Sequence, residues 1–211
     1  NLGAFSDREK QLLQTDLAYR KMVSKLLKEA RQTAKRNTCY FCGKSVSSFC
    51  NSHSIPRFCL ENIATNGEVL TLDTIVDNPL MDVKNGINKA GTFHLICNDC
   101  DSKIFSEYEN PENYLNPPTP KMIAQMALKN SLKSISTRLF EIELFNISPL
   151  EIEGSQIFDS KITISKMDLK GYEDSYKKAK KALEKDSSTD YHICYYEKLN
   201  YVVPIAFQCS L

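Results

Sequence analysis

The amino-acid sequence predicts an α+β fold, in which a small cysteine-rich module is flanked by long helices and a C-terminal α+β region. Three observations support this prediction: two long segments with helical apolar periodicity, a turn-rich middle with two C-x-x-C pairs, and short alternating apolar segments near the C-terminus. The chain has 211 residues, of which 42% are hydrophobic and 25% are charged. This composition is typical of a folded chain with a stable core and excludes a disordered one.

We divide the chain into three regions: an N-terminal helix at 1–38, the cysteine-rich module at 39–116, and a helix plus α+β region at 117–211. The second boundary follows from Pro117 and Pro118, because neighbouring prolines interrupt regular structure. The chain begins with Asn rather than Met and ends on a strand-like run, which is compatible with a fragment.

The N-terminal region is predicted to form one amphipathic helix. Ser6 and Glu9 have the spacing of a capping box, in which each side chain binds the backbone amide of the other. The region ends in a basic turn, which complements the helix dipole, so we expect this helix mainly to pack. Apolar residues recur at helical spacing and form one stripe: Leu12, Leu13, Leu17, Val23, Leu26, Leu27 and Ala30.

A second long helix is predicted from Pro120 to Phe145, since a proline suits its first turn and apolar residues recur along it. The rest of the chain is predicted to be a small α+β region, and we place the lysines of 177–181 on a solvated helix face. Its elements are strands at 150–158 and 161–167, a helix at 171–186, and strands at 191–196 and 201–208.

The formal net charge of +1 conceals an uneven distribution. Residues 1–38 carry nine basic and four acidic side chains, whereas residues 39–120 carry five and ten. Residues 121–140 carry four basic side chains and no acidic one. Basic flanks around an acidic middle suit a nucleic-acid partner beside a metal site, although solvated helix faces explain the charges equally well. Because the sequence has neither an apolar run of membrane-spanning length nor a signal peptide, we expect an intracellular, cytoplasmic protein without a membrane partner.

Two C-x-x-C pairs predict one structural zinc site, formed by Cys39, Cys42, Cys97 and Cys100. Each pair delivers two thiolates from one short turn, and Gly43 lets the backbone curl behind the first pair. A secreted disulfide framework is disfavoured in a chain without an export signal. A thiol–disulfide enzyme is a weaker alternative, because it leaves the second pair unexplained.

The segment between the two pairs contains Ser-His-Ser-Ile-Pro-Arg at 52–57. Together with the preceding Cys-x-x-Cys-Gly and the later Leu-Ile-Cys-x-x-Cys-Asp, this motif resembles the zinc-stapled branch of the HNH endonucleases. The resemblance covers 39–109, and Phe105, Tyr108 and Glu109 match its aromatic and Tyr-Glu tail. It implies a ββα-metal module, in which the first strand carries a general-base histidine and the helix after the last cysteine carries a metal ligand.

The resemblance implies roles for three residues of the module. His53 matches the histidine that activates water, and a neutral imidazole with a pKa near 6.5 can accept that proton at pH 7. Asp101 stands at the position of a ligand for a catalytic ion, and its oxygens suit Mg²⁺ or Mn²⁺. Asn88 is preferred over Asn98 as the asparagine of the family name. Ser52 departs from the pattern, because many members have a stronger metal ligand there.

Further candidates follow from position. A helix that begins near Asn98 is expected to carry Asp101 and Glu109 on one face, so Glu109 is a second candidate ligand for the catalytic ion. An exposed carboxylate is an equally open interpretation of Glu109. Arg57 is the candidate phosphate clamp, because a guanidinium can hold two phosphate oxygens, although a surface arginine is nearly as plausible. His94, on a strand expected at 92–96, is interpreted as a structural hydrogen-bonding residue.

The resulting hypothesis is a metal-dependent endonuclease that hydrolyses DNA phosphodiester bonds. Proteins that resemble this chain often act in restriction or defence against invading DNA, in some cases beside an ATPase subunit, so the resemblance implies DNA and such a protein as partners. The alternative from another class is a noncatalytic zinc module that binds nucleic acid or a protein.

Overall fold

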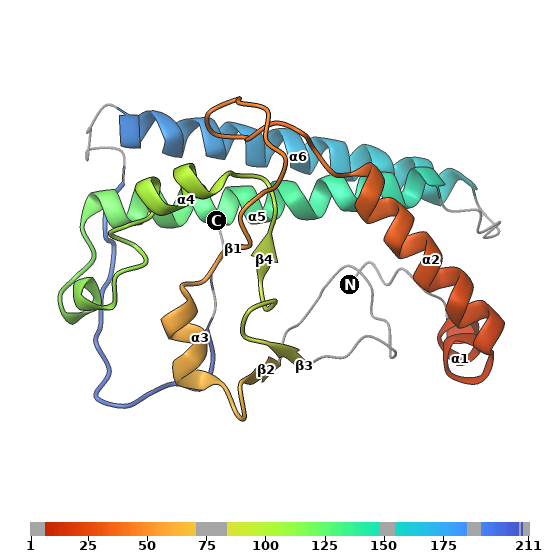
Figure 1. The fold of residues 1–211 in the computed structure, drawn as a ribbon, viewed down its shortest axis with the longest axis horizontal. Helices are drawn as coiled ribbons and strands as arrows, with labels where there is room; N and C mark the ends of the chain where they lie inside the picture. The colour runs from red at the N-terminus through yellow and green to blue at the C-terminus, as the bar shows by residue number, and fades with distance from the viewer. Residues whose placement is uncertain (1–6, 71–83, 148–154, 185–190, 207, 209–211) are drawn as a thin grey trace. The chain divides into compact units, whose positions relative to one another are not determined.

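The structure, a computed structural model, describes residues 7–70, 84–147, 155–184, 191–206 and 208. They form an α+β arrangement of helices and two small two-stranded sheets (Figure 1). Across these ranges, no helix combines the length and the apolar character that a membrane span requires. In chain order the elements are α1 (Asp7–Thr15), α2 (Leu17–Thr33), β1 (Ser52–His53), α3 (Arg57–Ile63), β2 (Glu68–Leu70), β3 (Lys84–Gly86), β4 (Thr92–Phe93), α4 (Asn98–Ile104), the 3₁₀ helix η1 (Pro111–Leu115), α5 (Pro120–Ile147) and α6 (Ser155–Glu184).

The described residues belong to two compact units, and α5 and α6 each contribute to both. Unit 1 contains α1, α2, the end of α5 and the start of α6, whereas unit 2 contains β1, α3, β4, α4 and the other parts of α5 and α6. Each unit is assembled from separated stretches of chain. The first draws on 1–35, 70–84 and 137–170, and the second on 36–69, 85–136 and 171–211.

The N-terminal helix of unit 1 is interrupted, which corrects the prediction of a single helix. The break lies at Asp16, whose extended backbone separates α1 from α2. Its carboxylate accepts hydrogen bonds from the backbone amides of Ala18 at 2.8 Å and Tyr19 at 3.1 Å, and so caps α2. An aspartate within a helical pattern can mark the N-terminus of a second helix, but the apolar stripe continues across Asp16 and predicted a single helix. The predicted capping box at Ser6 lies outside the described residues.

The core of unit 1 is built on the predicted apolar stripe with the exception of Leu17, which is exposed. Leu13 of α1 and Leu27 of α2 are buried together with Leu144 of α5. Near the end of α5, Arg138 contacts Glu141 and lies 3.2 Å from the carboxylate of Asp168 in α6. Thus the second predicted helix is confirmed as α5, and an ion-pair network joins it to the start of α6 within this unit.

The strand predicted at 161–167 is wrong, because these residues lie inside α6, and so do 155–158 of the strand predicted at 150–158. The remaining residues of that segment, 150–154, lie outside the described residues. Ile162 and Ile164 alternate locally, but the longer pattern has alternating steps of three and four residues, which is a helical period. The strands predicted at 191–196 and 201–208 are also wrong, since the described residues there form no strand and many of their large apolar side chains are exposed. Residues that follow the helical pattern are Ile162, Ser165, Leu169, Tyr172, Tyr176, Ala179 and Leu183.

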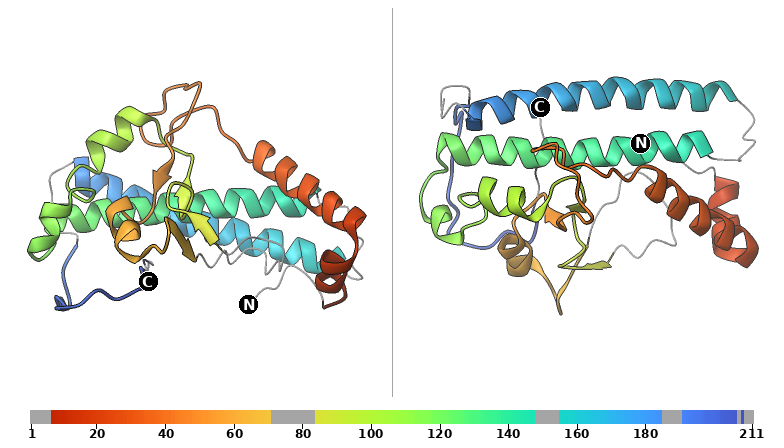
Figure 2. Two further views of the ribbon diagram at one scale, coloured as in Figure 1. Left: turned by 60° about the horizontal axis from the view of Figure 1, so that its bottom comes forward. Right: turned by 45° about the horizontal axis from the view of Figure 1, so that its top comes forward.

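Unit 2 is organised around one short antiparallel pair of strands. Ser52 of β1 pairs with Phe93 of β4, and His53 pairs with Thr92. Phe93, Leu95 and Ile96 are buried, although the strand is shorter than the predicted 92–96. The helix predicted near Asn98 is confirmed as α4. In this unit the C-terminal half of α6 runs alongside the N-terminal half of α5 (Figure 2).

Replacing Asp16 by Ala is expected to lower the free energy of unfolding by about 1 kcal/mol, because two backbone amides of α2 lose their hydrogen-bond acceptor. Urea denaturation followed by circular dichroism measures the change. Asp16→Asn is the matched control, since an asparagine caps a helix about as well as aspartate does. Equal losses in the two variants would contradict the capping role.

Candidate metal centre

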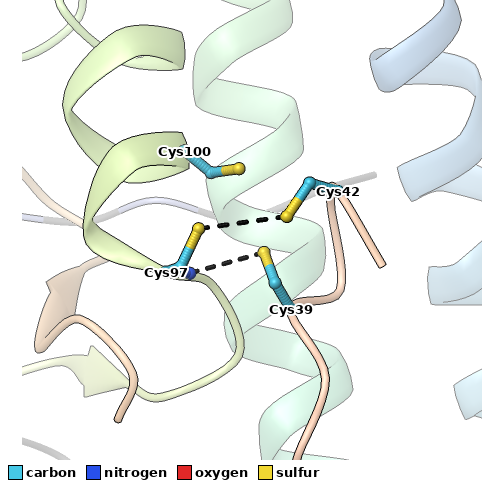
Figure 3. A group of neighbouring side chains, drawn as sticks. All are labelled: Cys39, Cys42, Cys97 and Cys100. Atoms are coloured by element: carbon cyan, nitrogen blue, oxygen red, sulfur yellow. Dashed lines mark hydrogen bonds between the residues drawn. The ribbon is translucent and has the colours of Figure 1, made fainter. Parts of the chain in front are cut away.

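Four cysteines form a cluster that can hold a metal ion, as the sequence predicted. The sulfur atoms of Cys39, Cys42, Cys97 and Cys100 all lie within 4.8 Å of one another. Figure 3 shows the four side chains pointing toward one another, two from a loop and two from the start of α4. The Cys42 and Cys97 sulfurs are 4.0 Å apart, close to the roughly 3.8 Å expected around one zinc ion with bonds of about 2.3 Å. Four sulfur donors in this arrangement fit a structural zinc ion.

The first cysteine pair is shaped by a tight turn. The amide of Gly43 donates to the carbonyl of Cys39 at 2.8 Å, and the amide of Cys39 donates to the carbonyl of Lys44 at 2.8 Å. Gly43 has φ of +69°, a left-handed conformation that glycine adopts without steric cost. The backbone therefore curls at the glycine, as expected from the sequence, and Cys42 lies close to Cys39.

The second cysteine pair opens a helix. Cys97 is the N-terminal cap residue of α4, and Cys100 lies in its first turn. The amide of Cys97 donates to the sulfur of Cys39 at 3.4 Å, which joins the two pairs directly. Burial raises the pKa of Cys39, but hydrogen bonds from the backbone amides of Cys42 and Cys97 outweigh it and lower this pKa to about 7. Cys39 is therefore prepared for the thiolate form in which cysteine binds metal.

Helix α6 holds the loop between Cys39 and Cys42. The Tyr176 hydroxyl donates to the carbonyl of Tyr40 at 3.0 Å, and the Lys180 ammonium donates to the carbonyl of Phe41 at 2.7 Å. The Tyr40 hydroxyl in turn donates to Glu173 at 2.7 Å. Lys180 is half-buried, so the prediction that it belongs to a solvated face is wrong. The helical period through Tyr176 was the sequence signal for this contact face.

His53 lies on β1, and its imidazole is held in one orientation. Its Nε2 atom is 2.9 Å from the carbonyl oxygen of Ile87. A carbonyl oxygen only accepts, so Nε2 carries a proton, and the neutral tautomer compatible with this contact has its lone pair on Nδ1. The next carbonyl, that of Asn88, accepts from the side chain of Asn51 at 2.6 Å, while the side chain of Asn88 itself is exposed. Asn88 thus contributes through its backbone to the loop that orients His53.

Asp101 lies next to β1, at the position predicted for a metal ligand. One carboxylate oxygen accepts from the Ser52 hydroxyl at 2.6 Å and lies 3.4 Å from the Lys129 ammonium. The other oxygen accepts from the Cys50 thiol at 3.2 Å. Burial and this hydrogen bond raise the pKa of Cys50 to about 12, so the thiol keeps its proton. Protein donors therefore already surround the carboxylate.

The structure corrects the expectation that Asp101 and Glu109 share one helix face. Helix α4 ends at Ile104, and Glu109 follows in a turn. The two carboxylates nevertheless converge, because the ammonium of Lys129 from α5 contacts both of them. Lys129 is completely buried, and nothing in the sequence analysis indicated it. The sequence feature that could have identified this residue is a lysine at an apolar, core-facing position of the long helix α5.

The remaining candidate residues are exposed to solvent, unlike Lys129. Arg57 is the first residue of α3, and its guanidinium is 2.8 Å from the carboxylate of Glu61. Its side chain is 60% exposed, so it remains accessible to solvent. His94 is exposed and directly follows β4, and His192 is exposed outside the module. The role of Arg57 as a phosphate clamp stays a prediction.

We expect the purified protein to contain about one zinc ion per chain. Cys42→Ser is expected to lose this ion and to unfold more readily, because the free energy of zinc binding stabilises the folded chain. Elemental analysis of metal content and thermal unfolding measure both effects. Cys194→Ser is the matched control, since Cys194 is exposed and lies outside the cluster. Retention of zinc by Cys42→Ser would exclude the four-cysteine site.

Comparisons of the chain with protein-family models, with curated proteins and with solved structures found no match. The chemistry of the site is therefore inferred from its own residues.

Proposed function

We propose that this chain is an HNH-like endonuclease that hydrolyses DNA phosphodiester bonds, with His53 as the general base. The observation that carries the proposal is the hydrogen bond between His53 Nε2 and the carbonyl of Ile87. It leaves Nδ1 as a fixed proton acceptor on a strand beside the candidate zinc site. In the proposed step, Nδ1 takes a proton from water while the water oxygen bonds to phosphorus and the bond to the leaving oxygen breaks.

The order of elements supports the same proposal. Two antiparallel strands, β1 and β4, are followed by α4, and the cysteine cluster lies at the start of that helix. We interpret them as the ββα-metal module that the sequence resemblance implied. The bond between Ser52 and Asp101 ties the first strand to the helix, so the residue before His53 meets the residue after Cys100.

The predicted catalytic Mg²⁺ or Mn²⁺ does not fit Asp101 and Glu109 as the structure arranges them. Both carboxylates contact the Lys129 ammonium, and Asp101 also accepts from Ser52 and Cys50. A divalent ion requires free oxygen ligands. We therefore assign no step of the reaction to such an ion at this carboxylate pair, and the requirement for it remains open to the cleavage assay.

The substrate side of the proposal rests on accessible positive charge. Arg57 lies at the first turn of α3, four residues after His53 along the chain, and its exposed guanidinium can exchange Glu61 for phosphate oxygens. An exposed ion pair is held weakly, so this exchange costs little. DNA as substrate and an ATPase subunit as partner remain parts of the proposal that the sequence resemblance suggests.

A second candidate function is a noncatalytic zinc module that binds nucleic acid or a protein. The observation that favours it is the ammonium of Lys129, which neutralises the carboxylates expected to hold a catalytic ion. In this case the cysteine cluster would act only as a structural clamp. The two candidates differ in whether the bonds of the bound nucleic acid are broken.

The deciding experiment compares the wild type, His53→Ala and His192→Ala for nicking of supercoiled plasmid DNA, with and without Mg²⁺ or Mn²⁺. His53→Ala is expected to reduce the cleavage rate by about 10²–10⁴-fold, the usual contribution of a general base. His192→Ala is the matched control, because this exposed histidine lies outside the module, and it is expected to cleave normally.

Unchanged cleavage by His53→Ala would remove this residue from the mechanism. If the wild type binds DNA without cleaving it under any of these conditions, the noncatalytic zinc module is the better description. Zinc content is measured for each variant, so that a loss of activity is not confused with a loss of the folded module.

A further inference from the structure

A buried lysine of unit 2 contacts two carboxylates, those of Asp101 and Glu109. The side chain of Lys129 is 0% exposed, whereas those of Asp101 and Glu109 are 14% and 36% exposed. Its ammonium is 3.4 Å from Asp101, contacts Glu109, and lies 4.5 Å from the centre of the Phe105 ring. A lysine is tolerated in a protein interior when opposite charges and an aromatic face replace its hydration.

We propose that Lys129 is a built-in cation that keeps divalent metal ions out of the Asp101–Glu109 pair. Removal of its ammonium opens a binding site for a hard divalent cation such as Mn²⁺ or Mg²⁺. This inference concerns the ion content of the carboxylate pair, so it holds whether or not the chain cleaves DNA.

The geometry indicates that a divalent ion and the Lys129 ammonium would compete for the same position between the two carboxylates. The carboxylates of Asp101, on α4, and Glu109, in the turn that follows this helix, both contact the ammonium of Lys129. An ion that bound the two oxygen atoms facing this ammonium would compete with it for the same position. An ion beside it would instead meet the repulsion of a like charge at short range.

The other ligands favour an oxygen-binding metal once the ammonium is gone. Asp101 holds the Ser52 hydroxyl at 2.6 Å, so a carboxylate oxygen and a hydroxyl oxygen already lie together. Glu109 supplies a further carboxylate, and its partial exposure gives access to water ligands. Carboxylate, hydroxyl and water oxygens are the donors that Mg²⁺ and Mn²⁺ prefer.

The test uses zinc-loaded protein titrated with Mn²⁺, with free Mn²⁺ followed by electron paramagnetic resonance. The wild type is compared with Lys129→Met, which keeps an unbranched apolar side chain but removes the charge. Lys133→Met is the matched control one turn along α5, where the ammonium donates to the carbonyl of Thr92 at 3.3 Å. Lys129→Met is expected to bind Mn²⁺ at least about tenfold more tightly than the wild type, because a unit positive charge is removed. Lys133→Met is expected to match the wild type.

A double variant, Lys129→Met with Asp101→Asn, identifies the ligands. It is expected to lose the gain in Mn²⁺ binding, whereas persistence of the gain would overturn the proposed site. Equal Mn²⁺ affinity in the wild type and Lys129→Met would also overturn the proposal. If Lys129→Met loses its zinc, the wild type is compared with Asp101→Asn instead. Tight binding of Mn²⁺ by the wild type that is lost in Asp101→Asn would contradict the proposal that the ammonium excludes the ion.

Discussion

The convergence of four thiols is the constraint on which unit 2 depends. Cys42 and Cys97 are 55 positions apart along the chain, yet their sulfur atoms are 4.0 Å apart. The neighbouring sheet is only two residues long on each strand and cannot supply much stability by itself. A metal ion held by four cysteines would add its binding free energy to the small apolar core of this unit, as structural zinc does in other small modules. The positions of β1 and α4, and hence of His53 and Asp101, follow from this cluster.

Helices outside the cysteine-rich segment complete the module. Helix α6 holds the backbone between Cys39 and Cys42 through Tyr176 and Lys180. Helix α5 supplies Lys129, and its Gln125 accepts a hydrogen bond from the backbone amide of Tyr108 at 2.8 Å. These contacts use buried polar groups, whose loss is costly because the partner is left unsatisfied. The module is therefore built by distant segments as well as by its own cysteines.

The balance of charge around Asp101 distinguishes this site from a simple collection of metal ligands. A hydroxyl, a thiol and an ammonium all face the carboxylate of Asp101. His53 is independent of this network, since its ring is oriented by a backbone carbonyl from the 87–88 loop. The imidazole of His53 and the carboxylate of Asp101 are therefore held by separate contacts, although Ser52 and His53 are neighbours on β1.

The sequence by itself determined the α+β class, the two cysteine pairs and the helix after Cys97, and the resemblance to the HNH endonucleases implied a strand at His53. The turn of each cysteine pair and the helix depend on local spacing, which a short turn or a helical period expresses directly. The segment 161–167 carries both a short alternation and a longer helical period, and only the tertiary structure decided between them; it also decided the partners of Asp101. A segment with alternating apolar residues becomes a strand only where a partner strand exists, and α6 follows a longer period. Lys129 is separated by 28 positions from Asp101, and the packing of α5 against the module, rather than any spacing in the sequence, brings their charges together.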